Sequence, residues 1–287
     1  MSYFSSSVLD DAINAEIWSD SVPVQARVRA QHTPDRADLL QGRMALPWVP
    51  DLVGPRWHEP GSVMVVGSAY SPFIAESAGR RRTMPAAVYR HATDAGAFVA
   101  EFLNHVVQGD SDYYDPLGTL LDGAGVDGSH VVLTDVVRGC FIDSDGVGGD
   151  DAVNADPVLY MALATAGWPW TWRRLCESRS TSLVALGTVA EHALLKLLHA
   201  EGARAVVGGH PGMTYRNSNR RVGGYARAGC DLAFWRDHRT WWEIECQVDG
   251  RARSWRLLPV VHPSPRAIRK DPGHVVTSGI LREMLAT

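Results

Sequence analysis

The stretch that decides the fold runs from Ser182 to His199, "SLVALGTVAEHALLKLLH". Its first six residues form a short apolar run that ends at Gly187, which is typical of a buried strand. From Val189 onward the apolar residues recur with the spacing of an amphipathic helix, and Thr188 is a candidate N-cap. A strand followed at once by a helix is the repeating unit of a parallel α/β sheet.

Three further apolar runs have the same character. They are Val63–Gly67 "VMVVG", Val131–Val137 "VVLTDVV" and Arg256–His262 "RLLPVVH". A helical pattern, Asp94–Val107, stands between the first two. This alternation predicts an α/β fold of three layers, α/β/α, with a central, mainly parallel four-stranded sheet. Ligands bind such sheets at the carboxyl ends of the strands, where Gly67, Asp135 and His262 fall.

The segment 202–250 interrupts the alternation. It is rich in Gly, Arg, Asn and Tyr up to residue 229 and then contains two strand-like runs about an Asp249-Gly250 turn. We therefore predict a single domain over residues 1–287, with an inserted loop and β-hairpin at 202–250.

Composition limits the classes of protein that the chain can belong to. At 287 residues and 45% hydrophobic content the chain can bury a substantial core, and no apolar run approaches the roughly 20 residues of a membrane span. The first residues lack the order of a signal peptide, so we expect a cytoplasmic protein. Four separated cysteines form no C-x-x-C pair, so we expect reduced structural thiols, no metal and no cofactor.

Charge is distributed unevenly along the chain. The net charge is −4, but residues 1–203 carry 14 Lys and Arg against 25 Asp and Glu, whereas residues 204–287 carry 14 against 7. Such polarity could place one basic face beside an acidic body, as a DNA-binding protein requires. Alternatively, arginine is simply abundant, since Lys196 and Lys270 are the only lysines.

Two of the predicted strand ends carry motifs that resemble a known family. The stretch Val260–Arg266, "VVHPSPR", resembles the H-P-S-P loop of the uracil-DNA glycosylase superfamily, with the following Arg as in its single-strand-selective monofunctional branch. The stretch Val65–Phe73, "VVGSAYSPF", is similar to that branch's G-x-N-P-G-P-F and keeps Gly67 and Pro72 as well as the final Phe. The match spans roughly residues 60–275 and leaves 202–250 unmatched.

The resemblance implies a monofunctional DNA glycosylase, which flips a pyrimidine out of DNA and hydrolyses its N-glycosidic bond. That reaction builds negative charge on the departing base. A neutral His262 would donate to the pyrimidine O2, and Pro263 and Pro265 would restrict the backbone that carries it, unless this is only a histidine satisfied in a tight turn. We expect contacts with DNA from Ser264, Arg266, Arg269 and Lys270.

The residue that would read the base departs from the family. The superfamily reads uracil with an Asn amide, and the strand register places Asp135 there. An ionised carboxylate only accepts hydrogen bonds, so it suits the amino group of cytosine, whereas a raised pKa would let Asp135 act as a donor. We expect His262 and Asp135 to converge on one pyrimidine from neighbouring strand ends. An inward Thr134, or an Asp135 that caps a turn, are the alternatives.

A second departure concerns the pocket around the base. The resemblance implies a pocket formed by Gly67, Ser68, Ala69, Ser71, Phe73 and Asp135. Ser71 stands where uracil enzymes place a tyrosine against C5, so a 5-substituted cytosine could enter unless Tyr70 or Phe73 refills the space. Phe73 is also the candidate for stacking on the base, with Met84 and Tyr89 as alternatives. Hydroxymethylcytosine and its glucosylated form occur in phage DNA, so the predicted role is phage defence.

Two assignments are less direct. The segment 202–250 could hold a sugar, act as a DNA-facing flap or pack on itself; its candidate contacts are Tyr215, Arg216, Asn217, Asn219, Trp241 and Trp242. The family's usual water-orienting residue is Ala69 here, and the best replacement is Asp94, which could instead be the N-cap of the following helix. Glu76 is a weaker candidate.

Three other functions compete with excision of a modified cytosine. They are uracil excision in base repair, a module that holds flipped DNA without cutting it, and an ordinary hydrolase built from Ser68 or Ser71 with His262 and Asp135. The hydrolase lacks the G-x-S-x-G elbow of its class. In all readings but the last we expect DNA with a flipped nucleotide as the partner, no membrane contact, and a monomer.

Overall fold

A computed structural model describes residues 3–19, 44–69, 73–75, 81–83, 93–104, 111–141, 157–215, 220–222, 225–227, 232–262 and 274–287. These residues form a mixed α/β structure, which confirms the predicted class. The helices are α1 (Ala12–Ser19), α5 (Ala95–Phe102), α6 (Ser111–Gly123), α8 (Pro157–Glu177), α9 (Thr188–Ala200), α10 (Leu232–His238), α12 (His274–Ala286) and the short 3₁₀ helix η2 (Gly128–His130).

The main sheet has eight strands rather than the predicted four. Their order across the sheet is β10 (His210–Thr214), β9 (Arg204–Val207), β13 (Trp242–Val248), β14 (Arg251–Val260), β8 (Ser182–Leu186), β3 (Val63–Ala69), β6 (Val131–Val137) and β2 (Leu52–Val53). The three pairings from β14 to β6 are parallel, and the other four are antiparallel. A mainly parallel four-stranded sheet therefore does not describe the whole layer.

Three small antiparallel pairs accompany the main sheet. They are β1 (Met44–Trp48) with β7 (Gly139–Phe141), β4 (Phe73–Ala75) with β5 (Arg81–Thr83), and β11 (Arg220–Val222) with β12 (Tyr225–Arg227).

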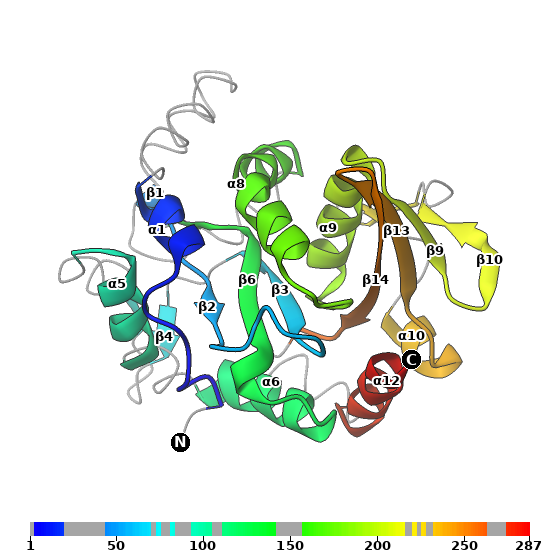
Figure 1. Ribbon diagram of the computed structural model, residues 1–287, viewed down its shortest axis with the longest axis horizontal. Coiled ribbons are helices and arrows are strands. Elements are labelled where there is room, and N and C mark those ends of the chain that lie inside the picture. The colour runs from blue at the N-terminus through cyan, green and yellow to red at the C-terminus, as the bar shows by residue number, and fades with distance from the viewer. Residues whose placement is uncertain are drawn as a thin grey trace.

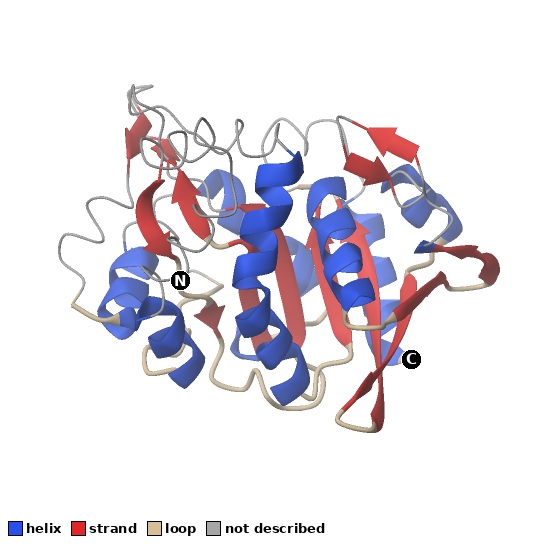
Figure 2. Cartoon of the chain, turned by 90° about the horizontal axis from the view of Figure 1, so that it is seen from above, coloured by secondary structure: helices blue, strands red, loops and turns tan. Residues whose placement is uncertain are grey.

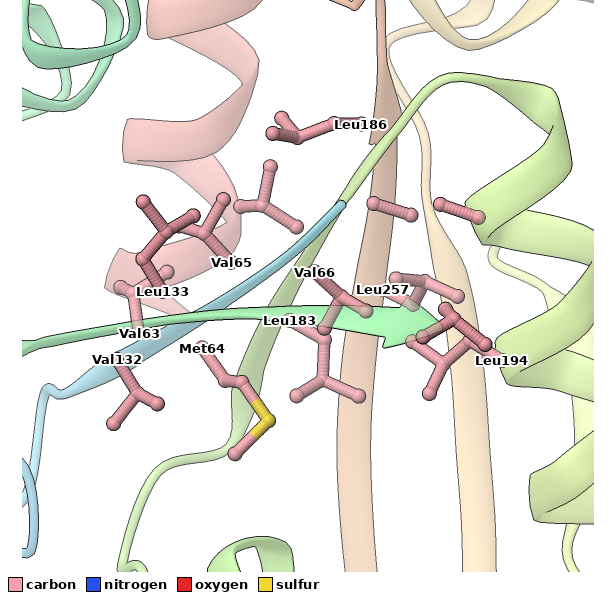
Figure 3. Close-up of a cluster of buried hydrophobic side chains, with 14 of the residues drawn as sticks. Val63, Met64, Val65, Val66, Val132, Leu133, Leu183, Leu186, Leu194 and Leu257 are labelled. Carbon is pink, nitrogen blue, oxygen red and sulfur yellow. The ribbon is translucent and has the colours of Figure 1, made fainter. Parts of the chain in front are cut away.

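Helices cover both faces of the sheet. Figure 1 shows α8 and α9 on one side of the strands and α6 and α12 on the other, and Figure 2 shows α8 and α9 in front of the sheet. Strands buried on both faces need apolar residues at successive positions, which is why β3, β6 and β8 read as continuous apolar runs. Figure 3 shows the resulting core, in which Leu194 of α9 lies beside Leu183 and Leu257 of the sheet.

The segment 202–250 adds β10, β9 and β13 to the same sheet. The predicted hairpin is present: β13 pairs with β14 from Trp242↔Leu257 to Val248↔Arg251, and Asp249 and Gly250 form the turn with φ of 50° and 74°. The last strand begins at Arg251, five residues before its predicted start. Its first half is the second arm of the predicted hairpin, so this arm and the strand predicted from Arg256 form one continuous strand; the arm is mostly exposed, whereas the second half is buried.

The start of α9 differs from the prediction. The N-cap is Gly187 rather than Thr188, and no side chain caps the helix. Gly187 has φ 88° and ψ 165°, a backbone conformation that glycine adopts readily and other residues rarely do. The chain therefore turns from β8 into α9 through a glycine. Of the helices described, none combines the length and apolar character that a membrane span requires.

Candidate functional site

The candidate site lies at the carboxyl ends of the four parallel strands. Their register aligns Gly67 with Asp135, Val66 with Ala185, and Val260 with Leu186. Side chains of paired residues on neighbouring strands point to the same face of a sheet. Asp135 and Gly67 therefore share a face with Val260.

That face is the one covered by α6 and α12. Val260 and Leu258 line a narrow cleft with Thr277 and Ile280 of α12. His262 follows Val260 by two residues, and its imidazole lies against the ring of Tyr113 from α6, with the ring centroids 5.3 Å apart. The side chains of Asp135 and His262 thus lie on the same face of the sheet, at the edge formed by the carboxyl ends of the parallel strands. Thr134 belongs to the opposite face, so the alternative in which Thr134 points to the site is not observed.

The prediction that the two side chains come from neighbouring strands is wrong. Strands β3 and β8 separate β6 from β14. Three spacings of about 4.8 Å put the backbones of Asp135 and Val260 about 14 Å apart across the sheet, and His262 lies about 7 Å further along its strand. The space between the two functional groups therefore lies over the ends of β3 and β8.

Gly67 allows Asp135 to lean over β3. A Cβ at position 67 would overlap Oδ1 of Asp135 and would lie 3.0 Å from its Cγ. Any larger residue at position 67 would push the carboxyl away. Because Gly67 has no side chain, the carboxyl of Asp135 can lie over β3, on the side of β6 that faces β8 and β14.

The carboxyl of Asp135 is buried, with the residue 7% exposed. Burial raises the pKa of Asp135 from its ordinary 3.8 to about 7, although Arg138 opposes the rise and Asp51 adds to it. Near neutral pH the group therefore exists both as an acid that can donate a proton and as a carboxylate that can only accept hydrogen bonds.

His262 has the opposite shift. Burial lowers the pKa of its imidazole below the ordinary 6.5. At neutral pH the ring is uncharged, with one nitrogen that donates and one that accepts. A neutral imidazole that donates to a developing anion needs this protonation state.

A buried ionic network lies on the other face of β6 and had no signal in the sequence. The guanidinium groups of Arg138 and Arg174 both bind the carboxylate of Asp51, and all three side chains are fully buried. Arg174 also binds Asp11 at 2.7 Å, and Arg138 donates to the Thr171 hydroxyl at 2.8 Å. Although burial opposes it, the two guanidinium groups hold the pKa of Asp51 below its usual range. The network fixes the end of β6 against α8 and α1.

The remaining residues of the predicted base pocket are placed as follows. Ser68 faces α8, because its hydroxyl donates to the Tyr160 hydroxyl at 3.2 Å and Tyr160 donates to the Ser68 carbonyl at 2.9 Å. The structure therefore separates Ser68 from Asp135. Ala69 ends β3 opposite Val137, and Phe73 begins β4, but the side chains of both lie outside the described part.

Asp94 is the N-cap of α5. Its Oδ1 accepts from the backbone N–H of Ala97 at 2.8 Å, and its Oδ2 accepts from the Thr93 hydroxyl at 3.2 Å. The side chain is exposed. Its structural role is therefore that of a cap, and no contact brings it to Asp135 or His262 among the described residues.

Several predicted residues fall outside the part of the chain that the structure describes. They are Tyr70, Ser71, Glu76, Met84, Tyr89, Pro263, Ser264, Pro265, Arg266, Arg269, Lys270, Arg216, Asn217 and Asn219. Of the sugar-binding candidates in 202–250, Trp242 is wrong: it is fully buried and donates from its indole to Glu191 at 2.8 Å. Trp241 and Tyr215 are half-buried, and the ring of Tyr215 contacts those of His192 and His199.

Metal chemistry has no visible ligand set here, since no cluster of three His, Cys, Asp or Glu side chains occurs within the described ranges. Cys176 and Cys246 are both free thiols. In comparisons with known proteins, no protein-family model matches the chain, and no curated protein has a matching sequence.

Proposed function

We propose that the protein is a DNA glycosylase that removes a cytosine-type base, modified at C5, and leaves an abasic site. One observation carries the proposal: the Asp135 carboxyl, with its pKa near neutrality, leans over Gly67 on the face of the sheet that also presents His262. A buried acid and a neutral imidazole that face the same space are suited to the two ends of one leaving group.

The protonated form of Asp135 complements cytosine. Its O–H can donate to N3 and its carbonyl oxygen can accept from the N4 amino group, a pairing that uracil cannot offer because its N3 carries a proton. As the N-glycosidic bond breaks, the electron pair moves onto the base. Transfer of the Asp135 proton to N3 and a hydrogen bond from His262 to O2 would neutralise that charge.

The topology supports the same proposal. The four strands to which the sequence motifs belong, β6, β3, β8 and β14, are neighbours in the sheet and mutually parallel. The two motif-bearing strand ends therefore open onto a common edge, as a pocket for one flipped nucleotide requires. With about 14 Å across β3 and β8 and about 7 Å along the strand, the backbones of Asp135 and His262 are about 16 Å apart, a separation that two side chains and a pyrimidine ring can bridge.

Specificity for a modified base rests on the sequence. Ser71, in place of the tyrosine of uracil enzymes, would leave room at C5, and a pocket that needs the substituent would spare unmodified host cytosine while it attacks phage DNA. Ser264, Arg266, Arg269 and Lys270 would contact the phosphate backbone on either side of the flipped nucleotide. Asp94 would orient the attacking water, and to do so its carboxylate would have to give up the hydrogen bond with which it caps α5.

The test is an abasic-site cleavage assay on single- and double-stranded oligonucleotides that contain cytosine, 5-hydroxymethylcytosine, its glucosylated form or uracil. We expect product from a modified cytosine, and loss of that product in His262→Ala. The exposed His58→Ala is the matched control. No product from any substrate would refute catalysis, and product from uracil alone would refute the cytosine assignment.

Asp135→Asn sharpens the test. An amide accepts from the uracil N3–H and donates to O4, so the variant should lose excision of cytosine bases and gain excision of uracil. The exposed Asp122→Asn should change neither. If Asp135→Asn retained the wild-type preference, the base would be read by another residue.

A non-catalytic module is the second candidate, favoured by Ala69 at the end of β3 and by the engagement of Asp94 as a cap. In that case the same oligonucleotides would bind with a preference for the modified base, and no abasic product would form at any enzyme concentration.

A further inference from the structure

Two segments from elsewhere in the chain lie close to His262, which follows β14. The ring of Tyr113, on α6, lies 5.3 Å from the imidazole between centroids, with the ring planes inclined at 52°. Gly187, which lies between β8 and α9, is close enough that a Cβ built there would lie 3.8 Å from the His262 Cβ. The imidazole-bearing residue is therefore enclosed between a helix and the glycine that precedes α9.

Tyr113 is itself held in place by the core. The next residue, Tyr114, is 7% exposed and makes edge contacts with Phe4 and Phe102, at centroid distances of 5.8 and 6.4 Å. One turn further along α6, Leu117 is 1% exposed. Since these side chains anchor the first turns of the helix, the ring of Tyr113 has a fixed position from which to contact His262.

Gly187 is fixed as well. Its N–H donates to the carbonyl of Val260 at 2.8 Å, and its own carbonyl accepts from Glu191 in the first turn of α9. The positive φ of 88° is a conformation that an L side chain rarely adopts. The backbone hydrogen bond ties Gly187 to the end of β14, two residues before His262.

We propose that Tyr113 and Gly187 form a clamp that sets the orientation and the burial of the His262 imidazole, with Tyr113 as a positioning residue. The clamp itself rests on the geometry, and only its consequence for catalysis rests on the proposed glycosylase function. Rotation of the ring would move its donor away from the place where charge develops on the base, and a misplacement of about 1 Å can lower a rate by about 100-fold.

The clamp can be tested without an activity assay. Burial is the cause that lowers the pKa of His262, and no charged group among the described residues adds to it. Histidine-labelled protein would be titrated by NMR, with the His262 signal assigned from His262→Gln. In Tyr113→Ala we expect the midpoint of His262 to move upward toward 6.5, its ordinary value. The exposed His58 in the same spectrum is the internal control.

The conservative variant separates the ring from the fold. Tyr113→Phe keeps the ring and should restore the wild-type midpoint, and a thermal melt of each variant reports whether it is folded. An unchanged midpoint in folded Tyr113→Ala, or a Tyr113→Phe midpoint that matches Tyr113→Ala, would overturn the clamp.

Kinetics then connect the clamp to the reaction. On the preferred oligonucleotide, Tyr113→Ala should lower kcat by up to about 100-fold with little change in KM, because substrate binding does not need the orientation of the imidazole. A change in KM alone would overturn the positioning role. If the wild-type protein cleaves no substrate, the proposed function fails, but the titration still decides the clamp.

Discussion

The raised pKa of Asp135 predicts a pH-dependent stability that one substitution should remove. The folded protein binds the Asp135 proton more tightly than the unfolded chain does, because its pKa rises from 3.8 to about 7 on burial. The group therefore favours folding most below pH 3.8, and this contribution is lost as the pH rises to about 7. A shift of about 3 units at 1.36 kcal/mol per unit corresponds to about 4 kcal/mol.

Asp135→Asn has no proton to lose, so its stability should lack this loss. The free energy of unfolding of the variant relative to the wild type should rise by about 3 kcal/mol between about pH 4.5 and pH 8, the part of the window accessible to equilibrium measurement. Glu191 is also buried and its pKa is raised to about 8, but it is present in both proteins and cancels in the difference.

Urea unfolding followed by the fluorescence of the ten tryptophans measures this difference across the pH range. The exposed Asp122→Asn should give a flat difference and serves as the control. If the free energy of unfolding of Asp135→Asn relative to the wild type changed by less than about 1 kcal/mol over this pH range, the Asp135 carboxyl would be hydrated and its pKa ordinary. Asp135 could then not serve as the proposed proton donor.

Three other perturbations test separate parts of the site. Gly67→Ala should displace the Asp135 carboxyl, destabilise the protein by about 1–3 kcal/mol and reduce excision at least about tenfold; in an Asp135→Ala background the same change should cost less, and equal costs in the two backgrounds would refute the overlap. Single-turnover rates should fall above about pH 7, as Asp135 ionises, and at acid pH, as His262 becomes charged; a basic limb that persists in Asp135→Asn would assign it to another group. Asp51→Ala should destabilise the fold by about 3–5 kcal/mol in urea unfolding, because it leaves the buried Arg138 guanidinium without a carboxylate and Arg174 with Asp11 alone; a loss under about 1 kcal/mol would contradict the buried network.

The parallel strands could be located from the sequence because they are covered on both faces. Burial on both sides requires successive apolar residues, so β6 was predicted with its observed bounds and β8 to within one residue. The strands β9 and β10, at one end of the sheet, gave no such signal, since exposed and half-buried residues interrupt them. Tertiary pairing, rather than local composition, makes them strands.

The candidate site was predictable only in part for a similar reason. A motif names residues near one another in the chain, and it identified the strand ends at Asp135 and His262. Tyr113 contacts His262, and the Asp51 network supports β6 from its other face; both depend on elements far apart in sequence, so no local pattern indicates them. One clue was present: a glycine at a strand end, Gly67, whose neighbour in register is a carboxylate, points to close approach of that side chain.

The double pairing of β14 limits how the chain could be shortened. On one edge this strand is hydrogen-bonded to β13 along its first seven residues, and on the other edge to β8 from Arg256 onward. His262 therefore follows a strand that is held from both sides of the sheet. Deletion of residues 202–250 would remove β13 and leave the backbone N–H and C=O groups on one edge of β14 unpaired, where a strand of another molecule could pair with them. A shortened version of the protein would therefore have to keep β13, because without it the exposed edge of β14 could pair with strands of other molecules.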